Sequence, residues 1–269
     1  LSLEHTELEL FHNIFLYSLF NISKLKKYAR SLSFKGGTCL YKSYGFPRFS
    51  EDLDFDAKLS KKQVDLLFNR YLADILGETF GFGNVRFRIK EHPTGFNIHT
   101  DIRGPAFSQT HRDCHIKFDL SSRKRLLYGL KEVKHDASLF LKNYGVEGII
   151  RLEIVDPREI FAEKIITILD KKFIFGQRDE ARDLFDLYIL LLKKYYCKFE
   201  DVEKKLPPDK KDVFTLKNFS DSIHQTVKPL EWKMMINQLI IELRLKELGL
   251  AREDLDFDQV SKFVIEKIK

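Results

Sequence analysis

The residues of this chain that are best suited to chemistry lie between positions 35 and 56. Asp52, Asp54 and Asp56 alternate there with apolar residues. Side chains two positions apart in a strand point to the same side of a sheet, so the spacing predicts a strand over 53–57 with the Asp52 and Asp54 carboxylates on one face. Like charges side by side repel each other. A divalent cation would relieve that repulsion, and carboxylate oxygens suit Mg²⁺ or Mn²⁺.

A pair of glycines, Gly36 and Gly37, precedes the carboxylates and follows a short apolar stretch, 32–35, that we expect to be a strand. Glycine has no Cβ, so the backbone can turn tightly and bring its N–H groups close to a ligand. A helix beginning at Thr38 would direct its first N–H groups at the turn, and such a helix start binds phosphate readily. This part of the chain therefore combines a phosphate-binding turn with a cation-binding strand.

The same residues carry a resemblance. Their order is similar to the nucleotidyltransferase superfamily that includes DNA polymerase β, and the wording Gly-Gly-Thr-x-Leu-x-Lys, then Arg-x-Ser-x-Asp-x-Asp-Phe, resembles the AbiEii/AbiGii toxin family. Two later segments resemble the same family: Glu-Ile-Phe-Ala-Glu-Lys, which ends at Lys164, and Ala-Arg-Asp-Leu-Phe-Asp-Leu, which contains Asp183. The resemblance covers residues 32 to about 190.

The resemblance implies an α+β fold, with a nucleotidyltransferase domain of mixed β-sheet over 1–155 and a C-terminal α-helical domain over 156–269. It implies Mg²⁺- or Mn²⁺-dependent transfer of a nucleoside monophosphate from an NTP to an acceptor hydroxyl. The expected acceptor is RNA, with tRNA 3′ ends first. The expected setting is a type IV toxin–antitoxin or phage-defence pair, with an AbiEi-type antitoxin as partner.

A third carboxylate is expected from a later strand. The segment 115–121 alternates, and Lys117 and Asp119 share its polar face. The family carries a similar Lys-x-Asp here, which favours Asp119; Asp101 and Asp113 are rivals for the same role. The resemblance thus assigns metal binding to Asp52, Asp54 and Asp119, nucleotide binding to Gly36, Gly37, Thr38, Arg48, Ser50 and Lys164, and catalysis to Asp52, Asp54, Asp119, Lys164 and Asp183.

Lys164 and Asp183 lie at the margins of the apolar faces of two expected helices, 156–171 and 176–194. Such a lysine either extends to the surface or serves a site, and an ion pair between the two residues is the structural alternative. The first helix has a strong start, in which Asp156 caps and Glu159 is expected to complete a capping box.

The remaining elements are expected from apolar periodicity. We predict helices over 4–20, 23–31, 61–76, 229–248 and 253–268, and strands over 85–89 and 97–101.

Composition bounds the class of protein. The 269 residues are 43% hydrophobic and 32% charged, which is typical of a globular chain and excludes a disordered one. The net charge of +6 is compatible with a polyanionic partner. Basic clusters at 23–31 and 122–135, the latter with Arg123, Lys124 and Arg125, are either nucleic-acid contacts or solvated surface.

The 3 cysteines are far apart and match no disulfide or zinc spacing. Without a disulfide framework, a reducing cytoplasm is expected. No apolar run is long enough for a membrane span. Two other functions stay open. In the first, the chain is a nucleotidyltransferase whose acceptor is a protein side chain or a small molecule. In the second, the chain binds nucleotide or a partner without turnover. The intact Asp-x-Asp argues against the last.

Overall fold

A computed structural model describes residues 2–122, 126–171, 180–206, 211 and 215–268. The chain divides into two compact units, a first one built around a mixed sheet and a second one built of helices. This arrangement confirms the α+β class predicted from the sequence. The first unit comprises Leu1–Tyr44, Ser50–Lys124 and Leu130–Val155, and the second comprises Gly45–Phe49, Arg125–Gly129 and Asp156–Lys269.

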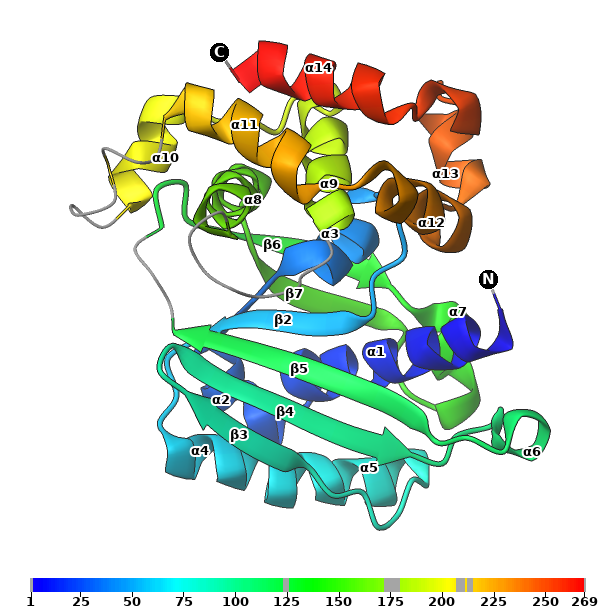
Figure 1. The fold of residues 1–269 in the computed structure, drawn as a ribbon. Helices are drawn as coiled ribbons and strands as arrows, with labels where there is room; N and C mark the ends of the chain where they lie inside the picture. The colour runs from blue at the N-terminus through cyan, green and yellow to red at the C-terminus, as the bar shows by residue number, and fades with distance from the viewer. Residues whose placement is uncertain (1, 123–125, 172–179, 207–210, 212–214, 269) are drawn as a thin grey trace. The chain divides into compact units, whose positions relative to one another are not determined.

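The first unit contains a seven-stranded sheet with strand order β3-β4-β5-β2-β1-β7-β6 (Figure 1). β2 pairs with β5 in parallel and with β1 in antiparallel orientation, and β1 pairs with β7 in parallel. The strands are β1 (Leu32–Lys35), β2 (Asp52–Ala57), β3 (Arg88–His92), β4 (Gly95–Ile102), β5 (Cys114–Ser122), β6 (Leu130–Asp136) and β7 (Ile149–Val155).

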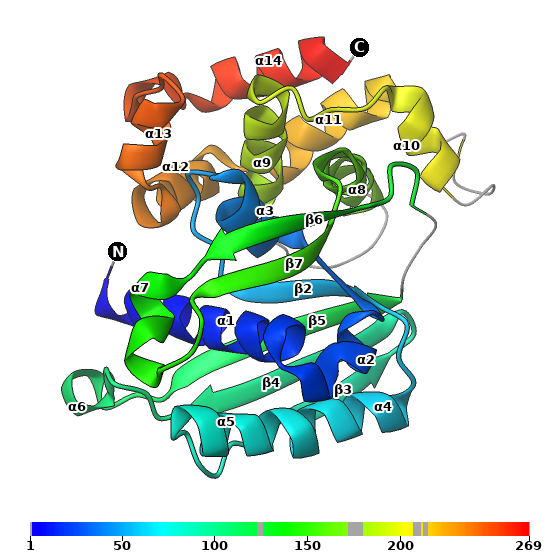
Figure 2. The same cartoon turned by 180° about the vertical axis from the view of Figure 1, so that it is seen from behind.

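Helices of the first unit cover one face of this sheet, as the two opposite views show for α1, α2, α4 and α5 (Figures 1 and 2). Aromatic side chains make the contact: Phe15 of α1 and Phe68 of η2 both meet Phe118 of β5 edge to face, at 4.9 and 5.1 Å between ring centroids. The helical segments are α1 (Leu3–Asn21), η1 (Ser23–Leu25), α2 (Lys26–Ala29), α3 (Gly36–Tyr44), α4 (Lys61–Asp65), the π-helical η2 (Leu66–Leu72), α5 (Ala73–Phe80), α6 (Phe107–Thr110), α7 (Ser138–Leu141) and η3 (Lys142–Tyr144).

Strand β2 has the alternation that its sequence predicts. Leu53 and Phe55 are fully buried on the helical side of the sheet, where Phe55 meets Phe20 of α1. Asp52 and Asp54 are partly exposed on the opposite side. The apolar contacts fix the register of the strand, because a slip by one residue would bury the carboxylates.

The strand predicted over 85–89 is displaced, since β3 begins at Arg88. Before that residue the Phe87 N–H donates to the Asn69 side chain (3.0 Å) and does not join the β-ladder. The alternation of apolar residues is real, but a side chain from a distant helix takes the hydrogen bond that a longer strand would need.

Strands β6 and β7 have no counterpart among the elements expected from the sequence. In β7, Ile150, Leu152 and Ile154 alternate and are fully buried, a period-two signal that could have been found. β6 overlaps the basic cluster at 122–135, and as an edge strand it carries charged side chains that hide the pattern.

The second unit is a set of helices. Its helical segments are α8 (Pro157–Lys171), α9 (Glu180–Leu192), α10 (Phe199–Lys205), α11 (Leu216–Thr226), α12 (Pro229–Leu239), α13 (Glu242–Glu247), η5 (Arg252–Asp254) and α14 (Phe257–Ile268). No helix in the described part of the chain, in either unit, has both the length and the apolar character needed to cross a membrane.

The single helix predicted over 229–248 is wrong, because the chain becomes extended between α12 and α13. Ile240 forms a β-bridge with Arg48, and the Ile241 N–H donates to the Pro47 carbonyl (2.7 Å). The short segment before Phe49 thus belongs to the second unit through backbone hydrogen bonds that sequence periodicity does not reveal.

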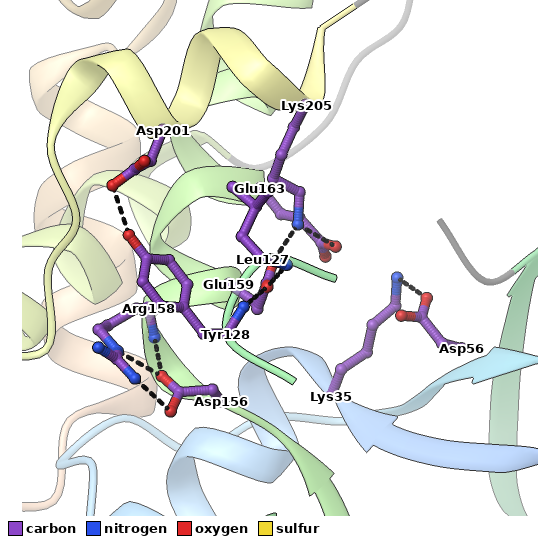
Figure 3. Close-up of polar contacts among 10 residues, drawn as sticks. All are labelled: Lys35, Asp56, Leu127, Tyr128, Asp156, Arg158, Glu159, Glu163, Asp201 and Lys205. Carbon is purple, nitrogen blue, oxygen red and sulfur yellow. Dashed lines mark hydrogen bonds and ion pairs between the residues drawn. The ribbon is translucent and has the colours of Figure 1, made fainter. Parts of the chain in front are cut away.

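The start of α8 shows a similar departure. The Asp156 carboxylate caps the helix by accepting a backbone N–H two residues on (2.9 Å). The predicted capping box is wrong. Glu159 instead accepts hydrogen bonds from the backbone N–H groups of Leu127 and Tyr128 and pairs with Lys205 of α10 (Figure 3). This buried carboxylate therefore holds the segment before Gly129 against two helices.

Candidate active site

The centre of the candidate site is a pair of carboxylates on neighbouring strands of the first unit. Asp54 on β2 lies directly opposite Asp119 on β5 in the parallel ladder, so both side chains lie on the same face of the sheet. One step earlier, Asp52 lies opposite Lys117, and the Lys117 ammonium contacts the Asp52 carboxylate at 2.6 Å. No role for Lys117 is predicted from the sequence, although the alternation of the segment places Lys117 and Asp119 on one face.

The two rival carboxylates have other partners. Asp101 on β4 accepts hydrogen bonds from His115 and Arg88, each at 2.7 Å, and the His115 bond is the main reason that its pKa lies below the usual value. Asp113 lies 3.6 Å from Arg103. Asp119 accepts a hydrogen bond from the neighbouring Ser121 hydroxyl (3.0 Å), and it alone of the three is in register with β2 at Asp54.

The glycine turn packs against one of these carboxylates. Gly36 has a φ of +74°, and a Cβ added to it would lie 2.1 Å from Asp54 Oδ2. α3 begins at Gly36 itself, two residues earlier than predicted, so its first N–H groups come from the glycines. Only a residue without a side chain allows the helix start to approach the Asp54 carboxylate this closely.

We expect Gly36→Ala to reduce nucleotidyl transfer by at least about ten-fold and to lower the melting temperature by a few degrees. The added methyl group would meet Asp54 and would also force a positive φ on alanine, which is unfavourable. Transfer kinetics and thermal unfolding measure both effects. Gly45→Ala is the matched control, because Gly45 has a φ of +64° and nothing within 4 Å of the added Cβ. Equal activity of the two variants would contradict the prediction.

Thr38 and Ser50, both predicted to bind nucleotide, are buried in the first unit. The Thr38 hydroxyl donates to the Asp52 carbonyl (2.5 Å) and so ties α3 to the start of β2. The Ser50 hydroxyl makes no hydrogen bond to any described residue. Their roles in nucleotide binding stay predictions.

The third carboxylate of the Asp-x-Asp-x-Asp run is neutralised locally. Asp56 is 1% exposed and lies 2.7 Å from the Lys35 ammonium, which comes from the adjacent strand β1 (Figure 3). Asp56 thus differs from Asp52 and Asp54, because it is buried beside a cation whereas those two carboxylates are partly exposed. Asp56 is therefore a structural group.

The donor set of this face fits a hard divalent cation. Asp52, Asp54 and Asp119 offer carboxylate oxygens. Asn97, which lies opposite Asp119 on β4, has a buried Oδ1 that accepts no hydrogen bond from any described residue. As the side chains stand, no group of three or more histidine, cysteine or acidic residues in the described ranges is arranged to hold an ion. Asp52 is turned to Lys117 in this arrangement.

The second unit contains a separate, buried cluster of charges. Arg48 donates to both Asp186 oxygens, from Nε at 3.0 Å and from Nη2 at 2.6 Å. Lys164 of α8 contacts Asp183 at 2.9 Å and Asp186 at 2.7 Å, both on α9. A site role is predicted from the sequence for Arg48, Lys164 and Asp183 but not for Asp186, which is 1% exposed and contacts both cations.

Electrostatics keep this cluster ionised. Burial opposes the charged form of Lys164, but Asp183 and Asp186 outweigh it and its pKa is raised. Burial likewise opposes ionisation of Asp186, but Arg48 and Lys164 outweigh it and its pKa is lowered. Two cations thus share two carboxylates at neutral pH, as expected for buried charges that persist in a folded chain.

The basic clusters were predicted either to bind nucleic acid or to be solvated. Residues 123–125 lie outside the described residues. In the other cluster, Lys24 and Lys27 lie over the Tyr71 ring, at 5.2 and 5.6 Å from its centroid, so both side chains have a local contact. Binding of nucleic acid by either cluster stays a prediction.

A mixed sheet whose Asp-x-Asp strand faces a third carboxylate and follows a Gly-Gly helix start defines the nucleotidyltransferase class. The family comparison is specific: the family described as "Nucleotidyl transferase AbiEii toxin, Type IV TA system" matches residues 18–261. The chain therefore belongs to the AbiEii family and is a nucleotidyltransferase toxin. Membership implies an NTP substrate and an antitoxin partner.

The chain is also similar to solved structures, and the first of those that follow shares its fold. JHP933 from Helicobacter pylori aligns with a TM-score of 0.53 and 19% identity over 100% of this chain and 94% of that one. MenT4, a nucleotidyltransferase toxin from Mycobacterium tuberculosis, aligns with a TM-score of 0.48 and 19% identity over 99% and 94%. An antigenic nucleotidyltransferase-like protein from Paracoccidioides brasiliensis gives 0.42 and 16% over 78% and 92%. No curated protein matches the chain.

Proposed function

We propose that this nucleotidyltransferase moves a nucleoside monophosphate from an NTP to the 3′ hydroxyl of an RNA, with tRNA 3′ ends as the leading acceptor. The setting would be a type IV toxin–antitoxin or phage-defence pair with an AbiEi-type antitoxin. The observation that carries the proposal is the register of Asp54 with Asp119, with Gly36 against Asp54. A net charge of +6 suits a polyanionic acceptor.

The reaction is an in-line displacement. The acceptor hydroxyl oxygen forms a bond to the α-phosphorus of the NTP, and the bond between that phosphorus and the oxygen bridging to the β-phosphate breaks. Pyrophosphate leaves with the bridging oxygen. We assign Asp119 as the base that takes the hydroxyl proton, because its carboxylate is partly exposed and lies beside Asp54.

Asp52, Asp54 and Asp119 would hold Mg²⁺ or Mn²⁺. When bound, such an ion supplies positive charge at the attacking and leaving oxygens. The backbone N–H groups of Gly36 and Gly37, at the start of α3, would bind the triphosphate, because a helix start favours anions. Thr38 and Ser50 would complete the nucleotide contacts.

We also assign Lys164 and Asp183 to the transfer step, and Arg48 to neutralisation of phosphate charge. Lys164 and Asp183 belong to the later motifs that resemble the family. Charges buried in this way are costly unless they are paired or used. Catalysis of phosphoryl and nucleotidyl transfer depends mainly on positioning and charge, which such residues supply.

The test is labelling with each radioactive NTP, Mg²⁺ and either total RNA or protein extract. We expect label in RNA, none with EDTA, and recovery when Mg²⁺ is added in excess. The three carboxylates and the triphosphate are all negative, so a bound cation is needed to offset their repulsion. RNA treated with periodate, which destroys the 3′ diol, should accept none. Label in protein instead of RNA would overturn the acceptor assignment. Label in neither, with a folded wild-type protein, would overturn the transfer reaction itself.

A further inference from the structure

Polar residues on the first unit's sheet form rows that cross the strands. Arg88 on β3 lies opposite His99 on β4, His99 lies opposite Lys117 on β5, and Lys117 lies opposite Asp52 on β2. Residues opposite each other in a ladder project from the same face. The row therefore runs in line from the edge strand to a carboxylate of the candidate active site.

A second row lies one step along the strands. Lys90 on β3 is opposite Asn97 on β4, which is opposite Asp119 on β5 and then Asp54 on β2. Lys90 is exposed and has no ion pair with any described residue. Both rows thus begin with a cation at the edge of the sheet and end at a predicted metal ligand.

These rows are open to solvent. In the first row, the side chains of Arg88 and Lys117 are 64% and 30% exposed. Strands lie about 4.8 Å apart, so each row from β3 to β2 is about 14 Å long.

Two histidines add a surface that a nucleobase can use. The His99 and His115 rings stack with centroids 5.4 Å apart and an angle of 29° between their planes. The His99 ring is partly exposed and the His115 ring is exposed, and both lie near cations of the two rows. Exposed aromatic rings beside cations are the usual platform for an unpaired base of RNA.

We propose that this face of β3, β4 and β5 binds the single-stranded 3′ end of the RNA acceptor, with Arg88 and Lys90 on its phosphates and the stacked histidines beneath a base. The inference rests on the proposed function. It adds the surface along which the acceptor reaches Asp52 and Asp54. RNA is favoured over a protein acceptor because phosphates and bases match both the cations and the rings.

The test compares Arg88→Gln/Lys90→Gln with the matched control Lys62→Gln/Arg70→Gln. The control removes the same charge from exposed residues of α4 and η2, on the helical side of the sheet. A short fluorescein-labelled single-stranded RNA with a free 3′ hydroxyl is titrated at several salt concentrations. We expect the first variant to bind on the order of ten-fold more weakly at low salt, with a log–log salt slope shallower by about 1.4, which corresponds to two lost phosphate contacts. The control should match wild type.

Kinetics separate this inference from the proposed function. In the Arg88→Gln/Lys90→Gln variant, KM for RNA should rise while KM for NTP and kcat stay near wild type. If that variant unfolds, Lys90→Gln alone serves, since this lysine makes no ion pair with any described residue. Wild-type labelling of RNA with equal binding by variant and control would overturn the surface and leave the function standing. Wild-type labelling of protein alone would overturn the function, and the titration would still decide the surface.

Discussion

Asp54→Asn is expected to lower nucleotidyl transfer by at least about a hundred-fold while the melting temperature stays the same or rises. Loss of a single group that stabilises transition-state charge typically costs 10²–10³ in rate. Stability should not fall, because the substitution removes a carboxylate that lies opposite Asp119 in the ladder and so relieves repulsion between them. Asp52→Asn should behave alike, since its partly exposed contact with Lys117 contributes about 1 kcal/mol at most.

Asp56→Asn is the matched control for this prediction. It changes the same residue type on the same strand and the same face, but it removes a buried partner of Lys35. We expect it to destabilise the protein by about 1.5–3 kcal/mol, because the buried Asp56 loses its charge-assisted contact with Lys35. Transfer per folded molecule should be kept. Radiolabel transfer and thermal unfolding, measured on all three variants, check both expectations. Robust transfer by folded Asp54→Asn would remove the metal assignment.

The part of the candidate site between Gly36 and Asp54 can be predicted from the sequence, because it depends on the spacing of residues that are close together in the chain. Alternation places Asp52 and Asp54 on one face, and the paired glycines mark a close backbone approach that a Cβ at Gly36 would block. The preference for Asp119 over its rivals rests on family resemblance. The register that sets Asp119 opposite Asp54 depends on pairing between distant strands, which one sequence does not specify.

The parts that sequence does not predict are those set by long-range contacts. Glu159 looks like half of a capping box, yet its carboxylate meets backbone N–H groups of the segment before Gly129. The helix predicted over 229–248 breaks where Ile241 bonds to Pro47. In each case local preference is overridden by a hydrogen bond to residues far away in the chain, because a buried backbone group must be satisfied.

Asp183→Asn is expected to lower transfer by about a hundred-fold with little change in stability. The alternative is that Lys164 and Asp183 form an ion pair that only holds α8 against α9. The structure separates the two readings, because Lys164 keeps Asp186 at 2.7 Å when the Asp183 charge is removed. The Asp183 side chain is 18% exposed, so its loss should cost only about 1 kcal/mol of stability.

Asp186→Asn is the structural control. Asp186 is 1% exposed and accepts from both Arg48 and Lys164, so its removal leaves Arg48 buried beside a weakened partner. We expect a loss of about 3–5 kcal/mol in the free energy of unfolding. The pKa of Asp186 is lowered in the folded state. Its contribution to stability is therefore fully present at a pH above the pKa of the unfolded chain, and it is lost as the pH falls through the pKa of the folded protein.

Lys164→Met completes the set, since it keeps the volume of the side chain and removes its charge. Its stability should fall, because Asp183 and Asp186 lose a shared cation, but Arg48 still holds Asp186. Transfer should fall far more than the folded fraction does, by about a hundred-fold or more, if the ammonium stabilises charge in the transition state. Unfolding in denaturant gives the folded fraction, and initial rates of NTP-dependent labelling give the transfer. Wild-type turnover by folded Lys164→Met and Asp183→Asn would assign the cluster to support of α8 and α9 and confine catalysis to the carboxylates of the sheet.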